Sequence, residues 1–179
     1  MTKRIMMLGA GFMQGVALRC AKARGWNVIA VDGNPHAVCS SQADRFEPID
    51  LKDTEALAAF ALQLKDNGGL DGVFTAATDF SASVAYVARS CNLPGHTYEA
   101  ALNASDKLRM RRCFEAAGVP SPAFVGVNAG NRSEIQRLMA ERRIGFPVVV
   151  KPVDNMGARG CRKVESENRL EAAIDDAIR

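Results

Sequence analysis

A lysine followed by a glycine-rich loop stands near the end of the chain, in the stretch "FPVVVKPVDNMGARGCRKV" (residues 146–164). The apolar run before Lys151 predicts a strand, and Arg159 follows between Gly157 and Gly160. Glycines let backbone N–H groups approach phosphate oxygens, and the two cations would supply charge. The stretch therefore predicts a phosphate site, with a flexible hairpin that carries solvated charges as the alternative. A Walker loop, in which the lysine follows G-x-x-x-x-G, is absent.

A second glycine loop, "GAGFMQG" (residues 9–15), lies near the start of the chain and leads into a helical pattern. Glycines suit such a turn because they allow positive φ, and the helix N-terminus behind it favours anions. Asp32 ends the next apolar run, where a dinucleotide-binding fold places its ribose-binding acid. Gln14, however, stands where the third glycine of G-x-G-x-x-G belongs. A turn without a ligand, an NAD site and a site for another small anionic substrate all stay open.

A third loop, "TAATDFS" (residues 75–81), follows another apolar run and carries a hydroxyl and a carboxylate. Loops at the carboxyl ends of parallel strands are where open α/β sheets bind ligands. These two side chains either cap the helix that follows or bind a ligand, and one residue can do both. Together with the first loop they complete the candidate substrate-binding residues: Gly9, Gly11, Phe12, Asp32, Thr78 and Asp79.

The elements that must position these loops alternate between strand and helix in the first half of the chain. Apolar runs predict strands, and repeats at helical spacing, such as Phe12, Val16, Cys20 and Ala23, predict helices. Short connections between the two kinds of element are typical of βαβ units. We therefore expect an α/β fold with a Rossmann-like parallel sheet and helices on both faces. The predicted strands lie within residues 4–11, 27–32 and 71–77, with a short apolar stretch at 46–49, and the helices lie within 12–25, 53–69 and 80–92.

The stretch "LPGHTYEAALNAS" interrupts this alternation and predicts a domain junction. We expect a first domain over residues 1–93, a linker over 94–104, and a small, incomplete α/β lobe over 105–179. In this lobe "PAFVGV" (residues 122–127), "FPVVVK" and "CRKV" read as strands, and Asn131 with Glu134 reads as a capping box. An apolar stripe from Leu170 to Ile178 predicts a final helix.

Composition excludes several classes of protein. The net charge is +3, and the densest basic stretch, "KLRMRR" (residues 107–112), has little aromatic interleaving, so we expect no nucleic-acid partner. Five scattered cysteines without a C-x-x-C pair indicate reduced thiols in the cytoplasm. His36 and Cys39 form a lone H-x-x-C, so we predict no metal site in this chain. No apolar run reaches the length of a membrane span.

Two segments together resemble the start of an ATP-grasp domain. They are "NASDKLRMRRCFEAAGVPSPAF" (residues 103–124) and "GFPVVVKPVDNMGARGCRKV" (residues 145–164). The resemblance rests on a D-K pair that begins a helix, then A-G-V-P-x-P, then F-P-x-V-x-K-P, then the glycine-rich loop. Residues before Asn103 are similar, more loosely, to the Rossmann-like domain that precedes ATP-grasp in carbamoyl-phosphate synthetase large chains, biotin carboxylases and purine-pathway ligases.

The resemblance implies an ATP-dependent carboxylate ligase that works through an acyl phosphate and uses magnesium. It also implies a small-molecule carboxylate substrate and leaves a homodimer as a possible assembly. In the family, residues that match the two lysines and the loop bind ATP phosphates. The implied phosphate-binding residues of this chain are Lys107, Lys151, Asn155, Gly157, Ala158, Arg159 and Gly160.

The adenine hinge, the magnesium ligands and the group that holds the acyl phosphate follow the last helix in the family. The resemblance therefore implies that this chain is an N-terminal fragment without catalytic residues of its own, inactive by itself. A non-catalytic binding module and an NAD(P)-dependent oxidoreductase are the alternatives. The reading frame after the codon for Arg179 would separate the ligase from the binding module.

Overall fold

The computed structural model describes residues 2–155 and 157–178. The chain divides into two compact units, Met1–Leu102 (unit 1) and Asn103–Arg179 (unit 2). The division lies within helix α4 (Tyr98–Ser105).

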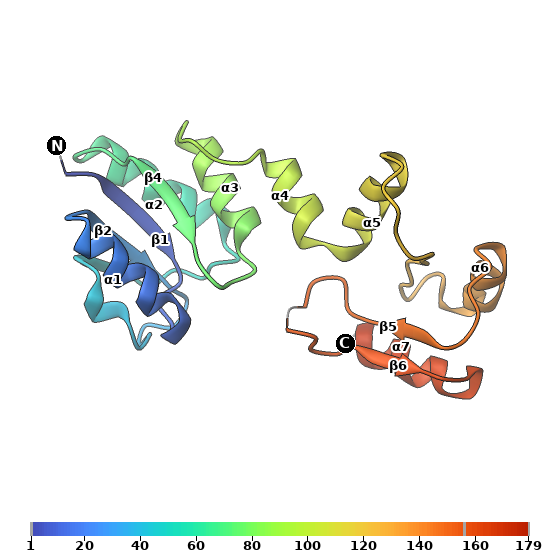
Figure 1. The fold of residues 1–179 in the computed structure, drawn as a ribbon. Coiled ribbons are helices and arrows are strands. Elements are labelled where there is room, and N and C mark those ends of the chain that lie inside the picture. The colour runs from blue at the N-terminus through green and yellow to red at the C-terminus, as the bar shows by residue number, and fades with distance from the viewer. Residues whose placement is uncertain (1, 156, 179) are drawn as a thin grey trace. The chain divides into compact units, whose positions relative to one another are not determined.

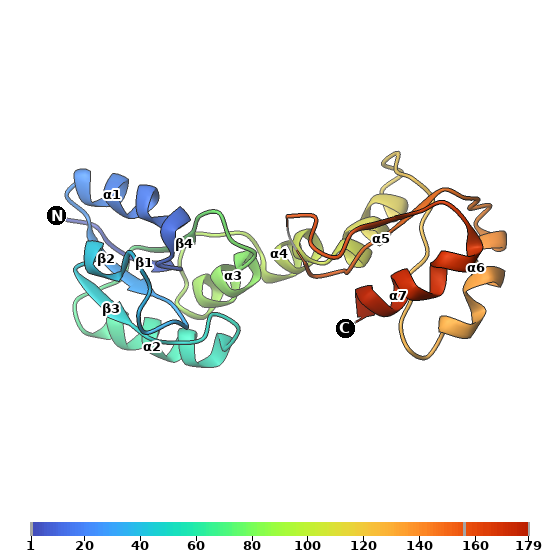
Figure 2. The same cartoon turned by 90° about the horizontal axis from the view of Figure 1, so that it is seen from below.

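Unit 1 contains a four-stranded parallel sheet in the order β3-β2-β1-β4 (Figure 1 and Figure 2). Each strand but the last is followed by a helix or turn that returns the chain to the amino end of the sheet, as parallel pairing requires. The strands are β1 (Arg4–Leu8), β2 (Asn27–Val31), β3 (Arg45–Glu47) and β4 (Gly72–Thr75). The helices are η1 (Phe12–Gln14), α1 (Gly15–Ala23), η2 (Ser40–Gln42), α2 (Thr54–Asp66) and α3 (Ser81–Ser90), with α4 after them.

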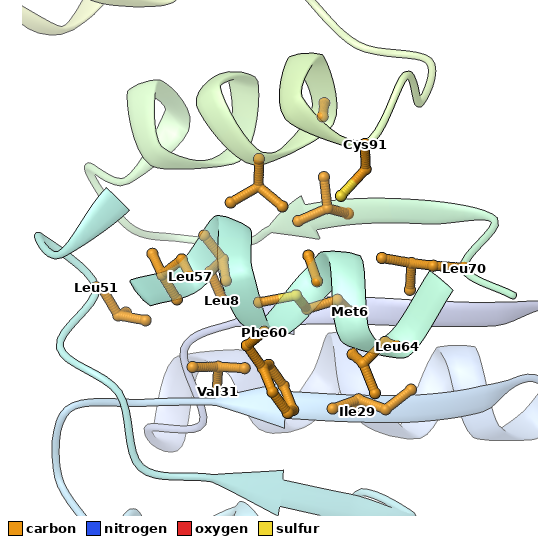
Figure 3. Packing of buried hydrophobic residues seen from close by; sticks show 14 residues of the cluster. Met6, Leu8, Ile29, Val31, Leu51, Leu57, Phe60, Leu64, Leu70 and Cys91 are labelled. Atoms are coloured by element: carbon orange, nitrogen blue, oxygen red, sulfur yellow. The ribbon is translucent and has the colours of Figure 1, made fainter. Parts of the chain in front are cut away.

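Helices cover both faces of this sheet, which confirms the predicted fold class. Figure 2 shows α1 on one side of the strands and α2 on the other. Alternate residues of β1 enter opposite cores, since successive side chains of a strand point to opposite faces. Met6 and Leu8 pack with α2 and α3 (Figure 3), whereas Ile5 and Met7 pack with α1.

The apolar repeat that predicts α1 lies mostly on the outer side of that helix. Phe12 and Val16 are 83% and 59% exposed, and Cys20 and Ala23 are exposed as well. The buried face is instead formed by Gly15, Leu18 and Ala21. The prediction of a helix was correct, but the helical face that packs on the sheet is the other one.

Unit 2 contains a two-stranded antiparallel sheet, β5 (Val148–Val150) with β6 (Arg162–Val164). Its core joins this sheet to α6 and α7 through Met139, Val164, Leu170, Ala173 and Ile174. The helices are α5 (Lys107–Ala116), η3 (Arg132–Glu134), α6 (Ile135–Glu141), η4 (Glu167–Arg169) and α7 (Leu170–Ile178).

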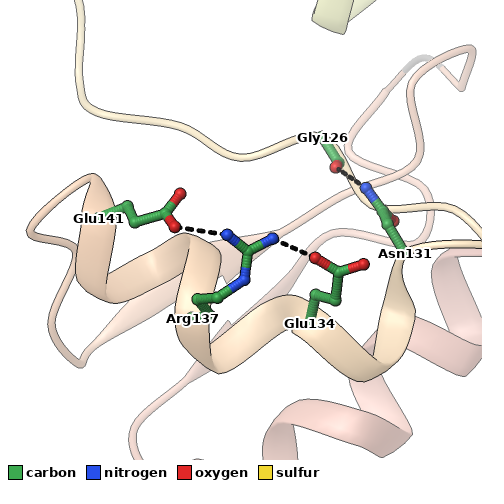
Figure 4. A network of polar contacts seen from close by, with 5 residues as sticks. All are labelled: Gly126, Asn131, Glu134, Arg137 and Glu141. Carbon is green, nitrogen blue, oxygen red and sulfur yellow. Dashed lines mark hydrogen bonds and ion pairs between the residues drawn. The ribbon is translucent and has the colours of Figure 1, made fainter.

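Two expectations for unit 2 were wrong. Residues 122–127 form no strand in the described structure; a backbone carbonyl of this segment, that of Gly126, instead accepts a hydrogen bond from the Asn131 side chain (Figure 4). The capping box is also absent, because Asn131 makes no side-chain cap bond to the helix. Its amide faces backward, accepting from Asn128 N at 2.8 Å and donating to Gly126 O at 3.0 Å.

Across the described residues, none of the helices has both the length and the apolar character needed to cross a membrane.

Candidate functional site

Lys107 is joined to the glycine-rich loop of unit 2. Asp106 caps helix α5 by accepting from Arg109 N at 2.7 Å, which fixes the first turn. The backbone N–H of Lys107 donates to Val153 O at 3.0 Å. Its ammonium donates to Val153 O at 3.2 Å and to Asn155 O at 2.5 Å. An ammonium has three N–H donors, so one donor remains for a ligand while two hold the loop.

The loop itself has a constrained backbone. Gly157, Ala158 and Gly160 have φ values of +63°, +58° and +73°, in the left-handed region. That region costs a non-glycine residue about 1–2 kcal/mol, so Ala158 is strained. A Cβ on Gly160 would lie 2.7 Å from Cγ of Pro152, so this position needs glycine for space as well as for φ. Met156, inside the predicted loop, lies outside the described residues.

The other two cations of the predicted site belong to the same hairpin. Lys151 is exposed and directly follows β5, two residues before the carbonyl that Lys107 holds. Arg159 is also exposed and lies between Ala158 and Gly160. The structure thus brings Lys107 to the backbone of the loop that begins at Lys151. The chemistry open to this set is the neutralisation of an anion by ammonium, guanidinium and backbone N–H groups.

In unit 1, the candidate substrate residues lie around the switch point, where the order in which strands are added to the sheet reverses. The chain adds β2 and β3 on one side of β1 and then returns to add β4 on the other side. Open α/β sheets bind ligands outside the carboxyl ends of strands at such a switch point. The loops that meet there are residues 9–15, after β1, and residues 76–80, after β4. The sequence predicted both loops, and the topology places them side by side.

Gln14 connects these two loops and was not among the predicted site residues. It is 6% exposed and donates from Nε2 to Ala76 O at 2.7 Å. A Cβ on Gly9 would lie 3.1 Å from Gln14 Cγ, and one on Gly11 would lie 3.0 Å from Gln14 Oε1. The side chain therefore fills the space above both glycines. In the sequence, Gln14 could be noticed because it stands where G-x-G-x-x-G has its third glycine. That pattern did not indicate that the Gln14 side chain is buried.

Asp32 holds the first loop through its carboxylate. Oδ2 accepts from Ala10 N at 2.8 Å, and Oδ1 accepts from Asn34 N at 2.9 Å. Phe12 lies on the solvent side of this loop. Both oxygens of Asp32 thus have a backbone partner in the described structure, which gives the residue a structural role whatever else it binds.

Thr78 and Asp79 differ in their contacts. Thr78 Oγ1 accepts from Phe80 N at 3.2 Å and lies 2.6 Å from Thr75 Oγ1. Helix α3 has no side-chain cap bond at its N-cap, Phe80. Asp79 Oδ1 is buried without a hydrogen-bond partner among the described residues. Ala77, just before them, has a φ of +53°. Helix capping therefore does not account for Asp79.

A hollow of about 260 Å³ in unit 2 lies apart from the predicted phosphate residues. Its walls come from α5, residues 124–126 and α6, and include the Arg142–Glu115 ion pair. In the part of the chain that the structure describes, no three His, Cys, Asp or Glu side chains gather into a group that could hold a metal.

Comparisons with known proteins agree with this architecture. Residues 113–179 match the family model described as "D-ala D-ala ligase C-terminus". The formate-dependent phosphoribosylglycinamide formyltransferase of Burkholderia pseudomallei (strain 668) is 31% identical over 170 residues, which is 95% of this chain and 41% of that protein. The chain thus spans about two fifths of the length of this curated relative.

Solved structures share the fold over nearly the whole chain. Phosphoribosylglycinamide synthetase from Anaerococcus prevotii matches with a TM-score of 0.66 and 26% identity, over 99% of this chain and 42% of that one. N5-carboxyaminoimidazole synthetase from Staphylococcus aureus, complexed with ADP, matches with a TM-score of 0.78 and 19% identity, over 99% and 46%. The family match in unit 2 and the fold shared across both units confirm the resemblance of this chain to the ATP-grasp superfamily.

Proposed function

We propose that this chain is the N-terminal part of an ATP-dependent carboxylate ligase and supplies one side of its ATP site. The observation that carries the proposal is the bonding of the Lys107 ammonium to Val153 O and Asn155 O. These bonds bring the lysine at the head of α5 to the loop that begins at Lys151. Charge neutralisation is the main requirement for phosphoryl transfer, so lysines and backbone N–H groups at one loop suit this reaction.

In the proposed reaction, a substrate carboxylate oxygen attacks the γ-phosphorus and ADP leaves with the electrons of the broken P–O bond. An amine or another nucleophile then attacks the carbonyl carbon of the acyl phosphate. Phosphate leaves with the electrons of the C–O bond, and the amine proton passes to a base. The chain's own part is to bind phosphate oxygens through Lys107, Lys151, Arg159 and the loop backbone.

The donor set fits the triphosphate of ATP better than it fits a metal. Lys107 retains one ammonium donor, and the loop offers exposed backbone around three left-handed residues, Gly157, Ala158 and Gly160. Magnesium prefers carboxylate and phosphate oxygens. We therefore assign its protein ligands to residues beyond this chain, together with the adenine hinge. The same proposal includes domain bounds of 1–93 and 105–179, a cytoplasmic localisation and a small-molecule carboxylate substrate.

A dinucleotide site at the first loop is not proposed. The glycines of such a motif let a pyrophosphate approach the backbone. Here the buried Gln14 side chain lies within contact distance of where a Cβ would stand on Gly9 and on Gly11. Calorimetry with NADH checks this point, since tight, specific binding would restore the oxidoreductase alternative.

The first experiment is a titration of the 179-residue chain with MgATP. A chain with only the phosphate-binding part of the site should bind ATP with a Kd of about 1 mM or weaker, because micromolar binding needs a binding free energy of about 8 kcal/mol. Backbone NMR signals of residues 151–161 and of Lys107 should move during the titration, and those of the first loop should not. Micromolar affinity, or shifts confined to unit 1, would contradict the proposed arrangement.

The second experiment uses the longer enzyme that contains this chain. Lys151→Met keeps much of the apolar stem and removes the charge, so kcat/KM for ATP should fall about a hundredfold, which corresponds to about 3 kcal/mol. Lys107→Met should lose a similar factor. Lys163→Met is the matched control, because Lys163 is an exposed lysine of the same hairpin that pairs with Glu165 at 2.7 Å. If kcat/KM of Lys151→Met stays within about threefold of the unmodified enzyme, the phosphate role is wrong.

A further inference from the structure

The switch point of unit 1 carries exposed apolar side chains. Phe12, Met13, Val16 and Val38 are 83%, 63%, 59% and 71% exposed, and we call these four the apolar rim. Phe12 and Met13 lie in the first loop. Val38 lies close to it, because the next residue, Cys39, donates its N–H to Ala10 O at 2.9 Å. Single exposed apolar residues are common, but a group of them around one edge indicates a binding surface.

Asp79 contributes an unmatched acceptor to the same edge. Its Oδ1 is buried and has no hydrogen-bond partner among the described residues. A buried polar atom without a partner destabilises a fold, and a charged group does so more than a neutral one. Just before Asp79, Ala77 has a φ of +53° and Ala76 O accepts a hydrogen bond from Gln14 Nε2 at 2.7 Å, so the backbone that leads to Asp79 is constrained. A ligand donor that bonded to this carboxylate would remove the destabilisation.

The charge of the two loops discriminates between substrate classes. Residues 9–15 and 75–80 contain Asp79 but no lysine or arginine. Recognition of a phosphate usually depends on such cations, whereas an ammonium group suits an aspartate. The apolar rim suits a hydrocarbon side chain.

We propose that the switch-point site of unit 1 binds a small primary amine with an apolar side chain, such as an apolar amino acid. Its ammonium group pairs with Asp79 and its side chain lies against Phe12 and Met13. The inference rests on the proposed ligase function, in which this molecule is the substrate that unit 1 holds. Phe12 and Asp79 then determine specificity, Phe12 for the apolar group and Asp79 for the charge.

The test is an NMR titration of the 179-residue chain with four probes: L-leucine, glycine, N-acetyl-L-leucine and ribose 5-phosphate. L-leucine should bind saturably and move the signals of residues 9–16 and 76–80. Glycine lacks the apolar side chain, and N-acetyl-L-leucine lacks the positive charge of the ammonium group. Each should therefore bind about tenfold more weakly than L-leucine, a difference of about 1.4 kcal/mol. Ribose 5-phosphate should not bind. If it binds more tightly than L-leucine, the proposed class is wrong and a phosphorylated substrate replaces it.

Variants assign the two contacts. Asp79→Asn keeps the shape of the side chain and should weaken L-leucine binding about tenfold, as should Phe12→Ser. Val119→Ser, an exposed apolar position in unit 2, is the control and should change nothing. A dispersed NMR spectrum shows that each variant is folded, and unchanged L-leucine affinity in a folded Asp79→Asn overturns the proposal.

Two further outcomes also overturn it. In one, no probe binds and the chain self-associates in a way that Phe12→Ser abolishes, which makes the apolar rim an interface between copies. In the other, no probe binds and the chain stays monomeric. Failure here is distinct from failure of the proposed function, because ATP is read from signals of residues 151–161 and L-leucine from signals of unit 1.

Discussion

The two units bury their helices to different extents. In unit 1, α2 lies on a four-stranded sheet and buries Leu57, Ala58, Phe60, Ala61 and Leu64. In unit 2, α5 buries none of its residues, and the sheet has two strands of three residues. Helix stability in proteins comes mainly from packing of an apolar face. Unit 1 is therefore stabilised by its core, whereas α5 depends on its cap, on the Lys107 bonds and on contact with the segment around Gly126.

The difference also separates two kinds of site. The switch-point loops of unit 1 leave the ends of buried strands, so their backbone positions are fixed by the core. The glycine-rich loop of unit 2 is held by hydrogen bonds from one lysine and by the packing of Gly160 on Pro152. We expect the second site to change shape more easily.

The largest predicted effect compares core truncations in the two units. Leu57→Ala should lower the free energy of unfolding of unit 1 by about 2–5 kcal/mol, because Leu57 is fully buried. Leu108→Ala on the half-buried face of α5 should cost about 1 kcal/mol or less. Trp26, the single tryptophan of the sequence, reports on unit 1 during urea unfolding. Hydrogen exchange of the amides reports on unit 2. Equal costs for the two substitutions would remove the distinction between the units.

The next prediction concerns the glycine loop. Gly157→Ala should cost the loop about 1–2 kcal/mol, since both glycines have left-handed φ and the space at Gly157 is open. Gly160→Ala should cost about 1–3 kcal/mol more, because its Cβ meets the Pro152 ring. Amide exchange at Lys107 N–H, which donates to Val153 O, measures the loss. Similar exchange in the two variants would show that contact with Pro152 does not hold the loop.

A smaller effect is expected at Asp44 in unit 1. Its pKa is lowered by the hydrogen bond from Lys22 and by that from Val28 N. A carboxyl whose folded pKa is lowered stabilises the fold above its unfolded pKa of about 3.9, and this stabilisation is lost as pH falls through the folded value. Asp44→Asn should therefore be less stable than the unmodified chain at pH 7 by about 1 kcal/mol or less, and the gap should close below about pH 4. Urea unfolding monitored by Trp26 from pH 7 to below about pH 4 measures the stability difference and its pH dependence. A stability difference that grows in acid would contradict the lowered pKa of Asp44.

The smallest effect is expected on the surface of unit 2. Arg137 pairs with Glu134 and Glu141 on the exposed side of α6 (Figure 4). Exposed ion pairs contribute about 0–1 kcal/mol, so Arg137→Ala should change the free energy of unfolding by about 0.5 kcal/mol or less. Asn131→Ala, which removes bonds to Asn128 N and Gly126 O, should cost about 1 kcal/mol. Thermal unfolding of the two variants in low and high salt measures both effects. A larger loss of stability for Arg137→Ala than for Asn131→Ala would show that the ion pairs contribute more than the Asn131 hydrogen bonds.

Most of unit 1 could be predicted from the sequence because its two central strands, β1 and β2, are buried over most of their length. Runs such as "RIMML" and "NVIAV" leave little choice but the centre of a parallel sheet. The buried face of α1 could not be predicted, because Phe12 and Val16 repeat at helical spacing yet face solvent. Hydrophobic periodicity indicates a helix here, but by itself it does not identify the helical face that packs on the sheet.

In unit 2 the sequence patterns indicated which segments could form strands and caps, but they did not predict the hydrogen-bond partners of those segments. "PAFVGV" has the composition of a strand, but a strand exists only where another backbone supplies hydrogen bonds. Asn131 and Glu134 have the spacing of a capping box, but Asn131 bonds toward Asn128 and Gly126 instead. The spatial link between Lys107 and the loop is a contact across 46 and 48 residues, which local sequence patterns do not show and family resemblance implied.

The position of β1 at the centre of its sheet has a consequence for synthesis on the ribosome. β1 is made first but pairs on one side with β4, and the bond from Thr75 Oγ1 to Leu8 O spans 67 residues. At about 5–20 residues per second, the ribosome needs roughly 3–13 s after β1 before β4 exists. During that time one edge of an apolar strand stays without its partner in the nascent chain. Unit 1 should therefore depend on chaperones that bind early apolar segments, and slow codons placed before Gly72 should lower the yield of folded protein.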